Sequence, residues 1–110
     1  MNLLSQDIEA FIKRGERIST LGGRSRVSFR KDLQGMYVFT ARGNRIPITQ
    51  EYISDTLRRY EMLKSQGVNE RGKRKYLATG EYNSPKWQAC PNNRACPYIA
   101  AIIAHLDNEN

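Results

Sequence analysis

Residues 26–48 constrain the fold of this chain most, because apolar and polar residues alternate there in three short runs separated by turn residues. Arg26–Arg30 alternates strictly, with the two-residue period of a strand that has one buried face. Residues 36–41 are rich in β-branched and aromatic residues, and residues 45–48 form a third run that contains Pro47. The pattern predicts a three-stranded antiparallel meander. Its last strand is expected to lie at an edge or to end at the proline, which cannot donate a backbone hydrogen bond.

Helical patterns flank the predicted strands. Apolar residues in the segment 3–14 recur at the spacing of one helical face, and Gly15 follows as a C-terminal glycine. Pro97 suits the first position of a final helix that continues through Leu106. This last helix is apolar nearly all round, which predicts that it lies in the core.

The segment directly after the meander carries the clearest helix signals. Thr49 is a suitable N-cap, and Gly67 stands where a glycine commonly ends a helix. Between them, apolar residues repeat with a helical period and define one buried face. Asp55 and Arg59 have the spacing of an i, i+4 ion pair, and the same pattern predicts that Arg59 lies on the exposed side.

The chain between the second and third predicted helices is polar and irregular. Residues 69–75 are predicted as a basic loop, and Tyr76–Thr79 as a short fourth strand. The order is therefore helix, three strands, helix, loop with a short strand, and helix, which describes an α+β domain. A length of 110 residues fits one domain, so residues 1–110 are predicted to form a single compact unit.

Positive charge is unevenly distributed along the chain, whose formal net charge is +7. Residues 1–46 contain nine basic and four acidic residues, and residues 69–97 contain six and two. The segment 47–68 between them has three of each, so two basic blocks flank a neutral one. Such a distribution favours a polyanionic partner, either nucleic acid or an acidic protein surface, over a uniformly solubilising surface.

The sequence gives no indication of a membrane segment or a secretion signal. No apolar run approaches the length of about 18 residues that a membrane-spanning helix needs. The N-terminal residues lead directly to Asp7 and Glu9 and lack the basic and apolar regions of a signal peptide. We therefore expect a cytoplasmic protein with no membrane partner, in which the two cysteines are thiols.

Few residues could carry catalytic or metal chemistry. His105 is the only histidine, so mechanisms that need two histidines in this chain are excluded. Cys90, Cys96 and His105 offer three ligands, but a structural zinc site has four and favours closer cysteine spacing. No phosphate-loop or dinucleotide-binding motif is present. We expect no metal and no cofactor, and a binding protein is favoured over an enzyme.

Gly22–Ser25 combines two glycines with an arginine and a hydroxyl. Its backbone N–H groups could cradle a phosphate. A flexible joint between the first helix and the first strand explains the same composition, and the sequence favours this simpler interpretation.

Two clusters of basic residues are the strongest candidates for a binding site. On the first predicted strand, Arg26 and Arg30 alternate with apolar residues and should lie on the face opposite the core. Arginine suits phosphate because its planar group can donate two hydrogen bonds at once. In the second cluster a basic run precedes Tyr76, an aromatic residue of the kind on which bases stack in single-strand binders. The first cluster comprises Arg24, Arg26, Arg30, Lys31, Arg42 and Arg45, and the second comprises Arg71, Lys73, Arg74, Lys75 and Tyr76.

These observations favour a non-enzymatic protein that binds the phosphate backbone of nucleic acid through both clusters. One alternative is a small metal-independent ribonuclease of the toxin kind, in which His105, a carboxylate or a tyrosine is the general base. Another is an interaction or inhibitor protein that binds an acidic protein surface. The strand arginines could instead form structural ion pairs with Asp32, Glu16 or Glu51.

Overall fold

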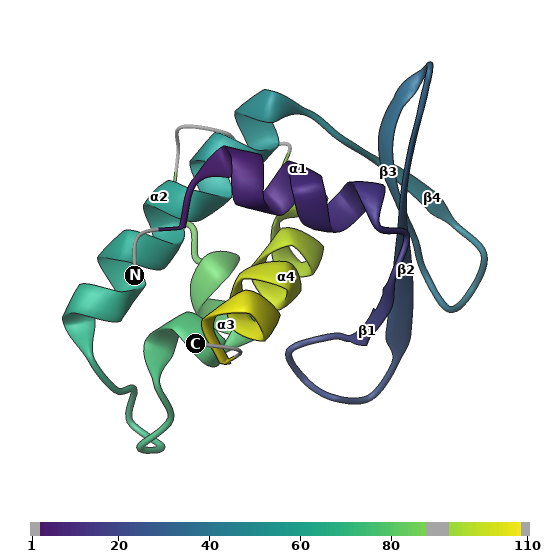
Figure 1. The fold of residues 1–110 in the computed structure, drawn as a ribbon. Helices are drawn as coiled ribbons and strands as arrows, with labels where there is room; N and C mark the ends of the chain where they lie inside the picture. Colours follow the sequence, from purple (N-terminus) through teal and green to yellow (C-terminus); the bar gives the residue numbers. More distant parts are fainter. Residues whose placement is uncertain (1–2, 88–92, 109–110) are drawn as a thin grey trace.

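The strands form one antiparallel sheet whose order in space is their order in the chain, β1-β2-β3-β4 (Figure 1). The computed structural model describes residues 3–87 and 93–108. Strands β2–β4 confirm the predicted meander, whereas the short strand before them was not predicted because its three residues are too few to show a period. The strands are β1 (Arg17–Ser19), β2 (Arg26–Asp32), β3 (Gly35–Phe39) and β4 (Arg45–Ile48).

The two edges of the sheet are short or interrupted. The first edge is β1, which has three residues. The second edge is β4, which contains Pro47, so the prediction of an edge strand there is confirmed.

The longer helices lie together on one side of this sheet (Figure 1). Thr49 is the N-cap of the second of them, since its Oγ1 accepts a hydrogen bond from the backbone N–H of Tyr52 at 3.1 Å. Gly67 ends this helix with a φ of +85°, which glycine adopts without strain. No helix in the described residues is long and apolar enough to cross a lipid bilayer. The three helices are α1 (Ser5–Lys13), α2 (Gln50–Gln66) and α4 (Cys96–Asn108).

Residues 76–79 do not form the predicted fourth strand. The segment folds instead into a 3-10 turn, η1 (Lys75–Leu77), followed by the short helix α3 (Thr79–Tyr82). Tyr76 and Tyr82 are both buried, and the Tyr82 hydroxyl donates a hydrogen bond to the carbonyl of Tyr76 at 2.8 Å. Their side chains pack the segment against the helices, so its apolar residues are used for packing and not for strand pairing.

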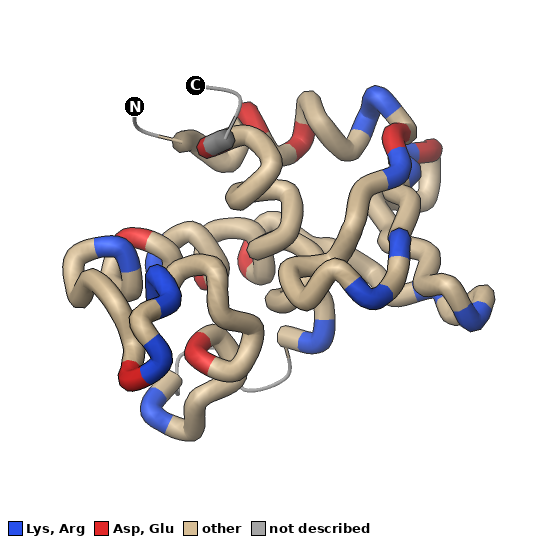
Figure 2. Tube along the Cα trace, turned by 90° about the horizontal axis from the view of Figure 1, so that it is seen from below, with Lys and Arg blue, Asp and Glu red and all other residues tan. Residues whose placement is uncertain are grey.

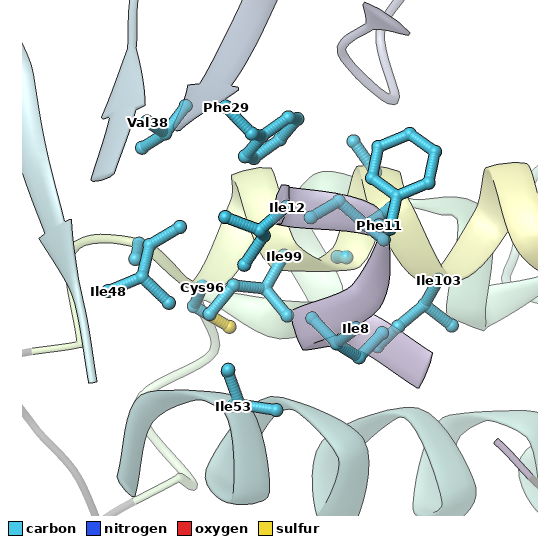
Figure 3. Close-up of a cluster of buried hydrophobic side chains, with 14 of the residues drawn as sticks. Ile8, Phe11, Ile12, Phe29, Val38, Ile48, Ile53, Cys96, Ile99 and Ile103 are labelled. Carbon is cyan, nitrogen blue, oxygen red and sulfur yellow. The ribbon is translucent and has the colours of Figure 1, made fainter. Parts of the chain in front are cut away.

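The core lies between the sheet and the helices, and α1 contributes to it by packing against β2, α2 and α4. The rings of Phe11 on α1 and Phe29 on β2 meet edge to face, with their centroids 6.0 Å apart. Helix α4 is buried along most of its length, as predicted, although Leu106 near its end is only partly buried. With a radius of gyration of 13.1 Å, the chain forms one compact α+β unit. Core side chains shown in Figure 3 include Ile8, Phe11 and Ile12 of α1, Phe29, Val38 and Ile48 of the sheet, and Ile53, Ile99 and Ile103 of the other helices.

A buried ion pair lies within α2, and its arginine also binds the end of α3. Nη2 of Arg59 lies 2.7 Å from Oδ2 of Asp55, and both side chains are almost fully buried. Nη1 of Arg59 donates a hydrogen bond to the carbonyl of Tyr82 at 2.6 Å. The Asp55–Arg59 pair is therefore present as predicted, but the prediction that Arg59 lies on the exposed side is wrong. The carbonyl and the carboxylate supply the partners that a buried guanidinium needs.

Candidate functional site

The sheet face turned away from the helices carries no other element among the described residues (Figure 1). In an antiparallel sheet, paired residues lie on the same face. The register pairs Arg30 with Tyr37 and Arg45 with Phe39, so side chains of three strands gather there. We call this surface the outer sheet face, and it is formed by Arg17, Ser19, Arg26, Ser28, Arg30, Asp32, Gly35, Tyr37, Phe39, Arg45 and Pro47.

Two aromatic side chains lie among these arginines. Tyr37 and Phe39 are half-buried, whereas the alternate residues of β3 point into the core. The guanidinium of Arg45 lies over the Tyr37 ring, with Cζ 4.5 Å from the ring centroid, which is a cation–π contact. Neither aromatic was among the binding residues predicted from the sequence. The available signal was the alternation within β3, which places both on the face of Arg30 once the β2–β3 register is known.

The arginines of the outer sheet face share it with one described acidic residue, Asp32, but form no ion pair with it. Within residues 3–87 and 93–108, no ion pair joins an acidic side chain to any of them. Glu16 binds Arg14 at 2.7 Å, and the carboxylate of Asp32 accepts hydrogen bonds from backbone N–H groups of its own turn. The structural ion pairs that Asp32, Glu16 or Glu51 might have formed with the strand arginines are therefore not observed.

Lys31 does not belong with the first cluster. It pairs with Met36 in the sheet register, so it lies on the helix side of β2. Its Nζ lies 3.7 Å from Oε1 of Glu9 on α1. Strand alternation explains the difference, because Lys31 follows Arg30 and must point to the opposite face.

A groove of about 860 Å³ lies at the end of the β3–β4 hairpin, against the first turns of α2 and α4. Arg42 and Arg45 line it together with Arg94, a residue that sequence analysis did not select. Peptide N–H groups in the first turn of a helix carry partial positive charge and add to the attraction for an anion. The other described residues that line the groove are Ser25, Thr40, Ala41, Asn44, Ile46, Pro47, Tyr52 and Tyr98.

A second groove, of about 460 Å³, brings the two basic clusters together. It is lined by Arg17 and Arg26 of the sheet and by Lys73 of the loop after α2, with His105 beside them. A smaller hollow that contains Arg24 shares lining residues with both grooves and so connects them. No acidic residue lines these three depressions in the part of the chain that the structure describes. We call them the basic track, whose charged members are Arg17, Arg24, Arg26, Arg42, Arg45, Lys73 and Arg94.

The Gly22–Ser25 segment forms part of the connection between β1 and β2 and lines the middle of the basic track. The N–H of Gly23 donates to the carbonyl of Thr20 at 2.9 Å, and the N–H of Thr20 donates to the carbonyl of Ser25 at 3.0 Å. These bonds close a hairpin loop, so the interpretation as a joint between helix and strand is wrong. The Gly23 N–H is already used within the loop, which weakens the phosphate-cradle interpretation.

The remaining basic residues of the second cluster lie on a structured loop. Oδ1 of Asn69 accepts hydrogen bonds from the backbone N–H groups of Arg71 and Lys73, both at 3.0 Å. Arg71 and Lys75 line a separate depression that also contains two glutamates, and Arg74 lines none of the three depressions of the basic track. Figure 2 shows basic positions in blue both on the sheet and around this loop. Lys73 is the member of the second cluster that reaches the basic track.

Tyr76 was predicted to offer a stacking surface, but the structure shows that it does not. Its side chain is buried, and its ring packs edge to face against Tyr60 with centroids 5.5 Å apart. The hydroxyl donates to Oδ2 of Asp107 at 3.1 Å and accepts a hydrogen bond from Nη1 of Arg74 at 3.2 Å. On β3, by contrast, Tyr37 contacts an arginine of the first cluster, Arg45.

Among the described residues, Cys96 and His105 do not come together in one site. Cys96 is a free, fully buried thiol, and burial raises its pKa, so it stays protonated and is a poor nucleophile. His105 follows nine residues later on the same helix, a rise of about 13 Å, too far for a shared metal ion. Cys90 lies outside the described residues. Within those residues, no group of three or more His, Cys, Asp and Glu is placed to hold a metal.

Comparison with known proteins adds no functional assignment to this site. The chain matches no protein-family model, and neither a curated protein nor a solved structure gives a significant match. The chemistry of the basic track and the outer sheet face is therefore the basis for any functional conclusion.

Proposed function

We propose that this is a cytoplasmic nucleic-acid-binding protein, without enzymatic activity, that contacts phosphates through residues of both basic clusters. The observation that carries the proposal is that Lys73, Arg17 and Arg26 line one groove of the basic track, where no described lining residue is acidic. Guanidinium groups without acidic neighbours attract polyanions, and each can give a phosphate two parallel hydrogen bonds.

The salt dependence of binding tests this proposal. For a short labelled duplex, the logarithm of affinity should fall linearly with the logarithm of salt concentration, by about 0.9 per phosphate neutralised. Replacing Arg26 and Lys73 together with Gln should make this slope shallower by about one to two units, because each removes one phosphate contact. Fluorescence anisotropy over a range of NaCl concentrations measures both quantities.

A variant with the same loss of charge serves as the control. Lys13 and Lys86 are exposed and line no part of the basic track. The double variant Lys13→Gln/Lys86→Gln should keep the wild-type slope. A folded Arg26→Gln/Lys73→Gln variant with unchanged affinity and slope would refute the proposal.

One observation favours the ribonuclease alternative as a second candidate function. His105 lines the same groove as Arg17, Arg26 and Lys73. In a metal-independent cleavage, a histidine can move protons while cations stabilise the negative phosphorane. RNA cleavage that is lost in His105→Gln while RNA binding persists would favour this alternative. A complex with an acidic protein that survives nuclease treatment would instead favour the interaction-protein alternative.

A further inference from the structure

The outer sheet face places aromatic and guanidinium groups in two adjacent rows across three strands. One row runs from Arg30 on β2 through Tyr37 on β3 to Pro47 on β4. In the next row, Phe39 lies between Ser28 and Arg45. Directly opposed residues in an antiparallel sheet are about 5 Å apart at Cβ, so each ring has polar or basic neighbours within contact distance.

The two rings are firmly supported from below. Tyr37 and Phe39 sit on β3, an inner strand that pairs on both sides, and Val38 between them is in the core. The Tyr37 ring also extends along its strand, because its hydroxyl lies 3.8 Å from where a side chain would begin at Gly35. A rigid aromatic platform loses little entropy when a flat ligand stacks on it.

We propose that the outer sheet face binds unpaired bases, which makes single-stranded nucleic acid the preferred ligand. This inference rests on the proposed function and deepens it. Bases of a single strand can turn out and stack on aromatic rings and guanidinium planes, while arginines at the rim hold the phosphates. Bases of a duplex are already stacked on each other and show only their edges, so a flat sheet face cannot reach their rings.

The composition of the face favours this ligand over a protein partner. Arg30 and Arg45 lie next to the two rings, Arg17 and Arg26 lie farther along the face, and none of the four forms an ion pair with a described acidic residue. The one acidic residue that the register places on this face, Asp32, accepts hydrogen bonds from its own turn. An acidic protein surface would satisfy the arginines without needing the aromatic rings. A single strand uses both groups, since it alternates phosphates with flat bases.

Removing the aromatic rings while keeping every arginine tests the inference. In Tyr37→Leu/Phe39→Leu, affinity for a short single-stranded pyrimidine oligonucleotide should fall by at least about 5-fold, because stacking contributes strongly per base. Affinity for the duplex of the same length should stay unchanged, and so should the salt slope, because the phosphate contacts remain. Fluorescence anisotropy gives the affinities, and circular dichroism establishes that the variant is folded.

The matched control exchanges the two rings and keeps their aromatic faces. Tyr37→Phe/Phe39→Tyr should bind the single strand as tightly as the wild type. Equal loss of single-strand and duplex affinity in the leucine variant, or no loss of either, would overturn the inference while leaving the proposed function standing. Wild-type protein that binds neither form of nucleic acid would overturn both, and binding to an acidic protein alone would point to the other class of partner.

Discussion

Two neighbouring arginines of α2 bind the same carboxylate but differ in exposure. Arg59 reaches Asp55 at 2.7 Å from a buried position, whereas Arg58 reaches it at 3.1 Å with its side chain 48% exposed. The helical pattern could not predict this difference, because the partners of Arg59 include the carbonyl of Tyr82, 23 residues away in the chain. Burial of a charge depends on such tertiary partners, which a sequence pattern does not show.

This difference in burial predicts different costs for two otherwise equal substitutions. Arg59→Met should lower the free energy of unfolding by about 3–5 kcal/mol, because it leaves the Asp55 carboxylate buried without its main partner. Arg58→Met should cost less than about 1 kcal/mol, since an exposed pair is screened by water. Urea denaturation followed by circular dichroism at neutral pH measures both. Equal and small effects would contradict the buried ion pair.

The buried Tyr82 hydroxyl and Cys96 thiol predict a loss of stability at alkaline pH. Burial raises the pKa of both groups above the ordinary values of 10.0 and 9.0. Above those values the unfolded chain loses protons that the folded chain keeps, so the free energy of unfolding falls as pH rises. Below them both states are protonated, and these groups cause no pH dependence.

Melting temperatures between neutral pH and about pH 11 measure this effect. Tyr82→Phe removes one of these titrating groups, so its melting temperature should fall less steeply above about pH 10. At neutral pH the same variant should be less stable by about 1 kcal/mol, because the hydrogen bond to the Tyr76 carbonyl is lost. Tyr37→Phe on the outer sheet face is the control. A Tyr82→Phe variant with the wild-type alkaline slope would show that this hydroxyl does not contribute.

At the level of helices and strands, length decided which elements the sequence could predict. The meander, α2 and α4 each extend over enough residues to show a period of two or 3.6. The strand β1 and the short helix α3 span three and four residues, less than the pattern needs. In such short segments the packing partner decides the conformation, and for Tyr76–Thr79 the partners are helices.

The burial of α4 gives a prediction at this scale. Ile102 is fully buried at the centre of the helix, so Ile102→Ala should lower the free energy of unfolding by about 2–5 kcal/mol. Leu33, an apolar residue of the β2–β3 turn, is fully exposed, and Leu33→Ala should leave stability unchanged. Chemical denaturation of the two variants makes the comparison. A neutral effect at Ile102 would show that α4 is not part of the core.

At the level of the whole molecule, the sequence predicted the members of the candidate site better than their arrangement. Strand alternation was enough to place Arg26 and Arg30 on one face. The arrangement of Lys73 beside Arg26, from separate blocks of the sequence, depends on how the loop after α2 packs near β1. Arg94 precedes a buried helix and had no nearby basic neighbour to draw attention to it. Tyr76 was predicted to bind nucleic acid because it follows a basic run, but its ring packs against Tyr60 in the core.

The short and interrupted edges of the sheet determine how copies of this molecule behave when they are concentrated. A long, regular edge strand is a template on which another chain can add a strand, and repeated addition produces fibres. Here one edge offers three residues, and the other lacks the N–H of Pro47. The arginines of the open face add mutual repulsion between copies. The fold can therefore leave an aromatic sheet face uncovered by other elements and still resist self-assembly into fibres.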